Sequence, residues 1–263
     1  MKKMMPFLLI ILATAVSAQQ TASGPCNPKT LPVLWQQTAA EYRALCYQAF
    51  NLATLRINEI PVKELKKGNL AIITDLDETI LDNSPGEAQV ILEQKTHSSA
   101  TWKEWTNLFA APALPGAVDF LKAAHAKGIS IFYISNRDTG EIASTLKNLK
   151  ALSIPCADPG HLLFQSNTSS KVARRQEVMK KYEVVLLLGD NLNDFESCFE
   201  KKPIPERLNE TDRLEEEWGK KFIVLPNCIY GEWENALYDY RKKLTETEKD
   251  SIRVSRLKGY KSK

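Results

Sequence analysis

The chain has 263 residues, 43% of them hydrophobic, and its 35 lysines and arginines nearly balance its 32 aspartates and glutamates, leaving a net charge of +3 at pH 7. This composition is typical of a folded protein with one large domain, or at most two, and the charge balance argues against nucleic acid polymers and membrane surfaces as partners. The five cysteines have no metal-type spacing, so we interpret them as small apolar residues, with one disulfide bond as the alternative.

The first eighteen residues have the pattern of a secretory signal peptide. Lys2 and Lys3 precede an apolar run over residues 7–16, and small residues lead to Ala18, after which we expect cleavage. Removing Lys2 and Lys3 lowers the net charge from +3 to +1, since the leader has no acidic residue. No segment offers the roughly 18 consecutive apolar residues that a membrane span needs. Gln19 stands where a lipid anchor would need a cysteine, so we expect an unanchored periplasmic or secreted protein.

The next segments predict a helix, a buried strand and an insertion. Apolar residues recur at helical spacing from Leu31 to about Ile57, which predicts one long amphipathic helix. The short β-branched run at residues 70–73 predicts a buried strand that ends at Asp75. The stretch from residue 82 to 112 is longer than a direct crossover requires. We expect it to form a mainly helical cap over the site, together with residues 31–60.

Strands and helices then alternate along the chain. The predicted helices cover residues 115–127, 139–152 and 170–182, and the predicted strands cover residues 129–134, 162–164, 184–188 and 222–225. This alternation favours an α/β fold of the Rossmann-like kind, a parallel sheet with helices on both faces. Ligands bind beyond the carboxyl ends of the strands in such folds. We interpret the basic end of the chain, residues 253–263, as a solvated tail.

Two aspartates one residue apart follow the first strand. If the backbone stays extended, Asp75 and Asp77 point to the same side of the sheet edge. A carboxylate can attack phosphorus and form an aspartyl-phosphate, and Asp75 at the strand end is the candidate for this role. A second carboxyl can protonate the leaving alkoxide and later deprotonate the attacking water, which suits Asp77. The pair therefore predicts phosphoryl transfer.

A metal ion is expected beside these carboxylates, because a phosphate dianion would otherwise be repelled. Mg²⁺ prefers oxygen ligands of this kind. Asp190 and Asp194 follow another predicted strand and are candidate ligands with Asp75. Helix capping is the alternative explanation for Asp190 and Asp194.

Hydrogen-bond donors for the phosphoryl oxygens are also expected at the strand ends. Ser135 and Lys171 are the candidates, and Lys171 would in addition keep Asp75 ionised. A solvated lysine and an ordinary loop hydroxyl are the alternatives. The order and placement of the polar clusters favour the functional roles, because each cluster follows a predicted parallel strand and the four strand ends would converge in one crevice.

Together these clusters resemble the four signature motifs of the haloacid dehalogenase (HAD) superfamily, and most closely those of the bacterial class C acid phosphatases. The resemblance rests on segments 75–84, 135–137, 169–171 and 189–194, with further likeness at residues 35–53, 114–117 and 226–233. It implies a HAD-type phosphatase domain over residues 19–263.

The resemblance also implies the ligands of the metal and the phosphate. The metal would be bound by the Asp75 carboxylate, the Asp77 backbone carbonyl and Asp190, with Asp194 in support. The phosphate would be bound by Ser135, Asn136, Arg137 and Lys171. Members of the family act on small phosphomonoesters, and some hydrolyse 5′-nucleotides while stacking the base on aromatic rings. Tyr230, Trp102 and Trp105 are the candidates here, with ordinary packing as the alternative. The resemblance also implies a possible homodimer.

Three other functions stay open at this stage. A phosphotransferase or a narrow sugar-phosphate phosphatase would use the same fold with another acceptor or substrate. A non-catalytic binding or storage protein would keep the fold without turnover. The presence of both Asp75 and Asp77 argues against the last of these.

Overall fold

A five-stranded parallel sheet forms the centre of the molecule. The computed structural model describes residues 27–260, so the predicted signal peptide and Cys26 lie outside the described residues. The strands are β1 (Leu70–Thr74), β2 (Ser130–Asp138), β3 (Leu162–Gln165), β4 (Glu183–Gly189) and β5 (Phe222–Val224). Their order in the sheet is β3-β2-β1-β4-β5, and every neighbouring pair is parallel. This confirms the predicted α/β fold.

The helices surround this sheet. They are α1 (Thr30–Thr38), α2 (Ala40–Glu59), α3 (Val62–Leu65), α4 (Ser84–Leu92), α5 (Ser99–Thr106), α6 (Ala117–Ala126), α7 (Ile142–Ala151), α8 (Val172–Met179), α9 (Ile204–Arg213), α10 (Glu232–Leu237) and α11 (Glu246–Ser255). In residues 27–260, no helix is long and apolar enough to cross a bilayer.

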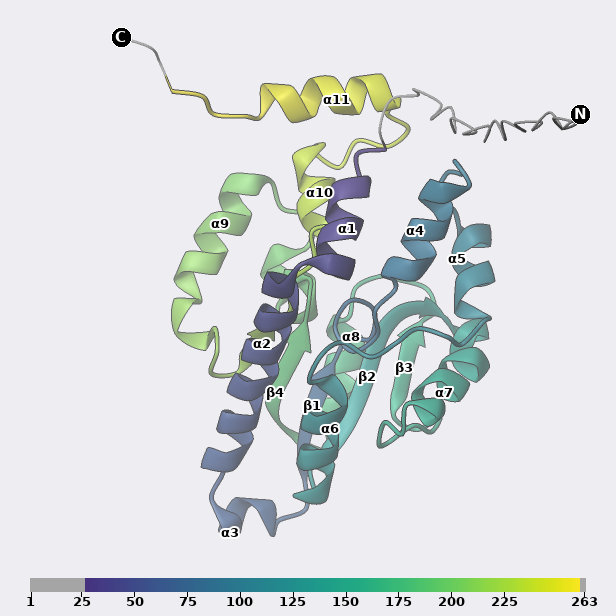
Figure 1. Ribbon diagram of the computed structural model, residues 1–263. Coiled ribbons are helices and arrows are strands. Elements are labelled where there is room, and N and C mark those ends of the chain that lie inside the picture. Colours follow the sequence, from purple (N-terminus) through teal and green to yellow (C-terminus); the bar gives the residue numbers. More distant parts are fainter. Residues whose placement is uncertain (1–26, 261–263) are drawn as a thin grey trace, which may run out of the picture.

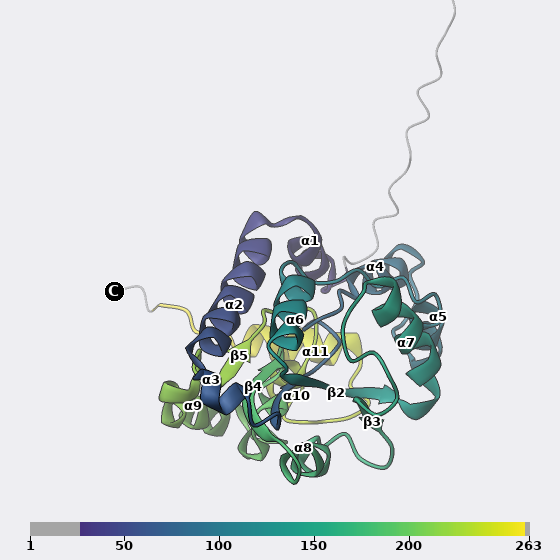
Figure 2. The same ribbon diagram turned by 90° about the horizontal axis from the view of Figure 1, so that it is seen from below.

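Both faces of the sheet are covered, which explains why the strands are apolar at successive positions. On one face, Ile72 and Ile131 pack against α2 and α6, where the rings of Phe50 and Phe120 are in contact in a tilted arrangement, with centroids 5.8 Å apart. On the other face, strand residues such as Ile73 pack with residues of α8. Figure 2 shows α2 and α6 on one side of the strands and α8 on the opposite side. Residues that alternate along a strand thus enter two separate cores.

The predicted helix over residues 31–57 is divided in two. Ala39 has extended backbone angles (φ −75°, ψ 125°) between α1 and α2. The apolar spacing continues across this break, because Trp35 and Tyr42 still pack edge to face at 5.3 Å. The helical periodicity therefore did not reveal the bend.

The bend gives the two helices different places. Helix α2 lies along the face of the sheet, whereas α1 lies beside α4 at the carboxyl end of the strands, and α5 lies on the other side of α4 (Figure 1). Of the segments expected to cover the site, α1, α4 and α5 are at that end, and α2 instead belongs to the core.

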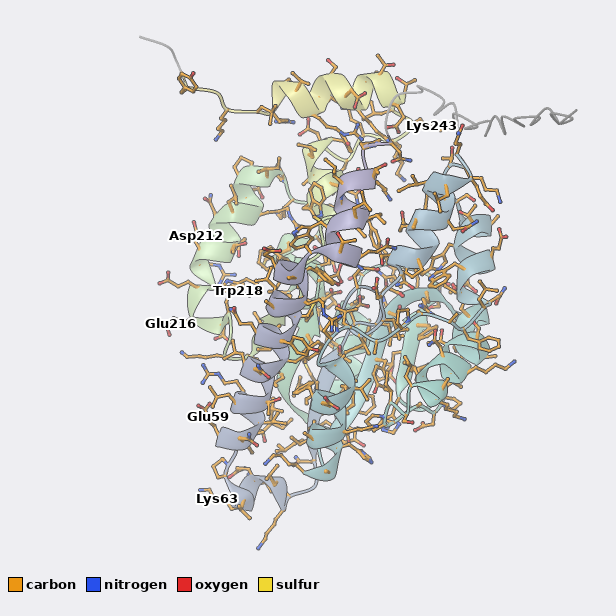
Figure 3. The ribbon with its side chains drawn as sticks, viewed as in Figure 1. Glu59, Lys63, Asp212, Glu216, Trp218 and Lys243 are labelled. Carbon is orange, nitrogen blue, oxygen red and sulfur yellow. The ribbon has the colours of Figure 1, made fainter. Side chains whose placement is uncertain are left out.

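The far edge of the sheet is closed by aromatic packing. Trp218 lies near α9 (Figure 3), and its ring contacts those of Phe195, Phe199 and Phe222 at centroid distances of 5.4–6.1 Å. The basic C-terminal segment is partly helical rather than wholly a solvated tail. In α11, Arg253 donates a 2.8 Å hydrogen bond from Nε to the Tyr238 hydroxyl.

Four of the five cysteines lie in residues 27–260, and all four are free thiols. Cys46 is buried in the core, as an apolar residue would be, and the other three are partly exposed. No disulfide bond forms among these four.

Candidate active site

A cavity of about 350 Å³ opens at the carboxyl ends of β1, β2 and β4. Nine of the residues predicted from the sequence line it: Asp75, Asp77, Trp102, Asn136, Arg137, Lys171, Asp190, Asp194 and Tyr230. Three residues that sequence reasoning did not single out line the cavity as well: Lys29, which precedes α1, and Glu87 and His97 of the predicted cap segment 82–112. The expected convergence of strand ends is therefore observed.

Asp75 lies directly after β1 and is 8% exposed. Its backbone N–H donates to the Leu188 carbonyl at 3.0 Å, which ties it to the end of β4. The Lys171 ammonium donates to Asp75 Oδ1 at 2.5 Å. Burial raises the pKa of Asp75 to about 7, with further increases from the charges of Asp194 and Asp77, although Lys171 opposes the shift. Asp75 is thus a buried carboxylate that depends on nearby positive charge.

Asp77 has the opposite surroundings. The Arg137 guanidinium donates from Nε to both carboxylate oxygens, at 3.0 and 3.1 Å, and from Nη2 to Oδ1 at 2.7 Å. Ser135 Oγ and Asn83 Nδ2 donate at 3.2 and 2.9 Å. Burial alone would raise the pKa of Asp77, but Arg137 and these donors bring the pKa below its ordinary value. The carboxylate is therefore fixed in orientation.

Ser135 and Arg137 were predicted to meet the phosphate, and the structure places both beside Asp77. Ser135 is fully buried and does not line the cavity, and its Oγ also accepts from the Arg137 N–H at 3.1 Å. Arg137 lies 5.6 Å from the centroid of the Trp102 ring. Asn136 lines the cavity, and its Oδ1 accepts from Arg174 Nη2 at 2.7 Å.

Three carboxylates form a group that can hold a cation. Oxygen atoms of Asp75, Asp190 and Asp194 lie within 4.8 Å of one another. Asp190 accepts from Thr79 Oγ1 at 3.2 Å and from Asn227 Nδ2 at 2.8 Å. Burial raises the pKa of Asp190 well above its ordinary value, and the charges of Asp194 and Asp75 add to the shift. The group favours a bound positive charge.

Lys171 and Asp194 are bound to each other inside this group. Lys171 stands at the start of α8, is buried, and lies 2.6 Å from Asp194 Oδ1. Burial would lower the pKa of Lys171, but the carboxylates of Asp194 and Asp75 raise it above its ordinary value, so Lys171 is a cation. Asp194 also accepts from the Asn191 N–H at 3.1 Å at the start of the short helix η2 (Leu192–Asp194). Asp194 therefore takes part in capping η2 and also belongs to the site, so the two explanations considered for it do not exclude each other.

A buried network behind Asp77 was not predicted. Glu78 has a left-handed backbone (φ 57°), is fully buried, and accepts from the Asn83 N–H at 2.9 Å and from the Tyr230 hydroxyl. Burial raises the pKa of Glu78 to about 8, and the neighbouring charge of Asp77 adds to this. Asn83 donates to Glu78 and Asp77 through the same Nδ2. Glu78 and Asn83 lie in the aspartate motif itself, but their roles depend on a tight turn that the sequence does not reveal.

Trp102 and Trp105 occupy different places. Trp102 and Tyr230 line the cavity, as expected for rings that could contact a substrate. Trp105 does not line it. Its Nε1 donates to Asn83 Oδ1 at 2.9 Å, and its ring packs so closely on Gly86 that a Cβ there would come within 2.6 Å. The position of Trp105 fits the packing alternative.

Comparison with protein-family models matches residues 10–233 to the HAD superfamily, subfamily IIIB (acid phosphatase). The chain belongs to this family. Acid phosphatases of this kind are phosphomonoesterases, so the chain is a phosphomonoesterase.

The comparison with solved structures agrees. The class C acid phosphatase from Bacillus anthracis superimposes with a TM-score of 0.83 and 41% sequence identity, over 89% of this chain and 98% of that chain. The same enzyme with tungstate bound matches equally well. Among curated proteins, the stem 31 kDa glycoprotein of Glycine max is 26% identical over 196 residues, which is 72% of this chain and 74% of that protein.

HAD phosphatases use a divalent metal, and the donor set of this acid phosphatase fits one. The side chains of this group are all carboxylates, whose oxygen atoms suit a hard cation. When ionised, the four aspartates of the site carry four negative charges, and among the described residues their carboxylates form ion pairs with two cations, Lys171 and Arg137, which leaves an excess of two. A divalent ion would balance that excess.

Proposed function

We propose that this acid phosphatase is secreted, binds Mg²⁺ and hydrolyses small phosphomonoesters through an aspartyl-phosphate on Asp75. The observation that supports this proposal most strongly is the contrast between two neighbouring aspartates. Asp75 contacts Lys171 and lies in the carboxylate group, whereas Asp77 is held by Arg137, Ser135 and Asn83. Two carboxyl groups with different surroundings can take two different roles.

In the first half reaction, an oxygen of the Asp75 carboxylate attacks phosphorus. The P–O bond to the leaving group breaks, and the leaving oxygen takes a proton from the Asp77 carboxyl. Because Arg137 holds the pKa of Asp77 low, Asp77 takes up this proton as the substrate binds, from the monoanionic form of the phosphomonoester. In the second, Asp77 takes a proton from water, the water oxygen attacks phosphorus, and the bond to Asp75 breaks to release phosphate. The proton lent by Asp77 is thereby returned, and one residue serves as acid and then as base. Lys171 keeps Asp75 ionised and donates to the phosphoryl oxygens, as Asn136 can.

The Mg²⁺ ligands we propose are the carboxylates of Asp75 and Asp190 and the backbone carbonyl of Asp77, with Asp194 in support. When bound, the ion supplies charge that offsets the repulsion between the phosphate and these carboxylates. The oxygen-only donor set supports the choice of a hard ion over a softer metal.

The substrates we propose are small phosphomonoesters, including 5′-nucleotides. A volume of about 350 Å³ is of the size that takes a small molecule, and the rings of Trp102 and Tyr230 line it. Flat leaving groups can stack on such rings. The predicted signal peptide over residues 1–18 supports a periplasmic or secreted location, and a homodimer stays a prediction.

The test is an isosteric change of the nucleophile. Asp75→Asn keeps the size of the side chain but removes the attacking oxygen anion, and we expect release of phosphate from p-nitrophenyl phosphate to fall by at least about 10³-fold. Asp119→Asn, an exposed position on α6, is the matched control and should keep wild-type activity. Chelation should abolish activity until Mg²⁺ is restored. Turnover by Asp75→Asn at more than a tenth of the wild-type rate would contradict the mechanism.

A further inference from the structure

The cap end of the cavity contains a charged group that the phosphate chemistry does not use. Glu87, in the first turn of α4, is only 3% exposed although it lines the cavity. Lys29 Nζ donates to Glu87 Oε2 at 3.1 Å, and His97 Nδ1 lies 3.0 Å from Glu87 Oε1. Burial alone would raise the pKa of Glu87. The hydrogen bonds and charges of His97 and Lys29 lower it by a larger amount, so the pKa of Glu87 lies below its ordinary value. Glu87 is thus an anion that fixes one side chain on each side.

The two residues held by Glu87 keep hydrogen-bonding capacity toward the cavity. Lys29 and His97 have side chains that are 27% and 45% exposed, and both line the cavity. The ammonium of Lys29 has three protons, and Glu87 takes one of them. Since an ionised carboxylate can only accept, His97 Nδ1 must carry the proton shared with Glu87, which leaves Nε2 as the second hydrogen-bonding atom of the ring. Lys29 and His97 therefore each offer a polar group to a ligand in the cavity, and Glu87 holds both in place.

Aromatic rings flank both groups. Lys29 Nζ lies 5.5 Å from the centroid of the Tyr230 ring, and the His97 ring lies 6.2 Å from that of Trp102. If Lys29 and His97 served only to join the segments around Glu87, their contacts with Glu87 would be enough. Here both residues also line the same cavity as Asp75.

We propose that Lys29 and His97, positioned by Glu87, form a subsite that binds the hydroxyl groups of a polyhydroxylated leaving group, such as a sugar ring. A hydroxyl both donates and accepts, so neighbouring hydroxyls can accept from Lys29 and form a hydrogen bond with His97 Nε2 at the same time, in either direction. This inference rests on the proposed function, because it assigns the leaving group of that reaction. It makes the acid phosphatase selective for sugar-containing phosphomonoesters over apolar ones.

The experiment compares two substrates that differ only in hydroxyl groups. Ribose 5-phosphate has the ring hydroxyls, and tetrahydrofurfuryl phosphate has a similar ring without them. We expect wild-type kcat/KM to favour ribose 5-phosphate by about tenfold or more, since each net hydrogen bond contributes a factor of roughly three to ten. Lys29→Met and His97→Phe should each lower this ratio by about three- to tenfold, mainly through KM for ribose 5-phosphate.

Lys63→Met is the matched control. Lys63 is exposed on α3, at the end of the molecule opposite α4 and α5 (Figure 3), and its variant should keep the wild-type ratio. A wild-type ratio near one, or a ratio unchanged in both subsite variants, would overturn the inference. If Lys29→Met does not fold, the wild-type ratio and His97→Phe decide the matter. Failure of the wild-type protein to hydrolyse either substrate would instead refute the proposed function.

Discussion

Gly189 allows Asp194 to reach the carboxylate group, and replacing it tests the geometry of the site directly. Gly189 ends β4, and an added Cβ would lie 2.5 Å from Asp194 Cβ and 2.8 Å from Asp194 Cγ. Ordinary carbon contacts lie at about 3.5–4.0 Å, so Gly189→Ala must move Asp194 or the strand by roughly 1 Å. The backbone of Gly189 is not left-handed, so the change acts through this clash rather than through backbone strain.

Two effects of Gly189→Ala follow. The displaced Asp194 loses its geometry toward Lys171, 2.6 Å away, and toward the other carboxylates. Disturbing a supporting ligand of this kind typically costs about 10–100-fold in metal affinity. Overpacking costs about 1–3 kcal/mol, which lowers the melting temperature of a protein of this size by about 2–12 °C.

The assay for Gly189→Ala is a Mg²⁺ titration of p-nitrophenyl phosphate hydrolysis, combined with thermal unfolding. Gly160→Ala is the matched control, because its Cβ would come no closer than 3.2 Å to an exposed aspartate outside the site. It should need no more Mg²⁺ than the wild type. If the Mg²⁺ concentration that gives half-maximal activity of Gly189→Ala is within twofold of the wild-type value, the role of Asp194 in supporting the metal site is refuted.

Three further changes probe the surroundings of the site. Arg137→Gln removes the guanidinium that orients Asp77 and also lowers its pKa. We expect the lost orientation to outweigh the raised pKa, so hydrolysis of an alkyl phosphate, which needs a proton donor, should fall about 10²-fold more than hydrolysis of p-nitrophenyl phosphate. Trp105→Phe removes the N–H that bonds Asn83, together with part of the ring system, and should cost about 1–3 kcal/mol of stability with little change in KM. Glu87→Gln removes a carboxylate whose pKa is lower in the folded state than in the unfolded state. The carboxylate therefore stabilises the fold at pH values above its unfolded pKa, near 4.5, and this stabilisation is lost as the pH falls through its folded pKa. The melting temperatures of Glu87→Gln and the wild type should therefore differ at neutral pH and converge in acid.

Each of these outcomes has a clear opposite. Equal losses on alkyl and aryl phosphates would mean that Arg137 does not act through Asp77. A large rise in KM for nucleotides in Trp105→Phe would favour a ring that contacts substrate. A difference in melting temperature that persists unchanged well below pH 4 would show that the charge of Glu87 does not contribute to stability.

The strand ends could be predicted from the sequence because local patterns determine them. Short apolar runs followed at once by Asp75 or Asp190 indicate buried strands with polar residues at their carboxyl ends, and topology then brings those ends together. The bend at Ala39 could not be predicted, since packing of Trp35 on Tyr42 preserves the apolar spacing across it.

The finer parts of the site depend on side-chain directions, which spacing does not encode. Ser135 follows the predicted strand, but it donates to Asp77 instead of lining the cavity. Lys29 and Glu87 are 58 residues apart in the chain, and their contact exists only because α1 and α4 lie side by side. Such long-range pairs become visible only in the folded structure.

The central claim is that the phosphoryl group passes through Asp75. The most direct measurement uses Asp77→Asn, which should form the aspartyl-phosphate from p-nitrophenyl phosphate and hydrolyse it slowly, because the residue that activates water is missing. Borohydride reduction of the trapped protein converts a phosphorylated aspartate to homoserine, which mass spectrometry of the peptides locates. We predict homoserine at position 75 and at no other aspartate. Steady turnover with no modification at Asp75, or modification at another carboxylate, would contradict the account.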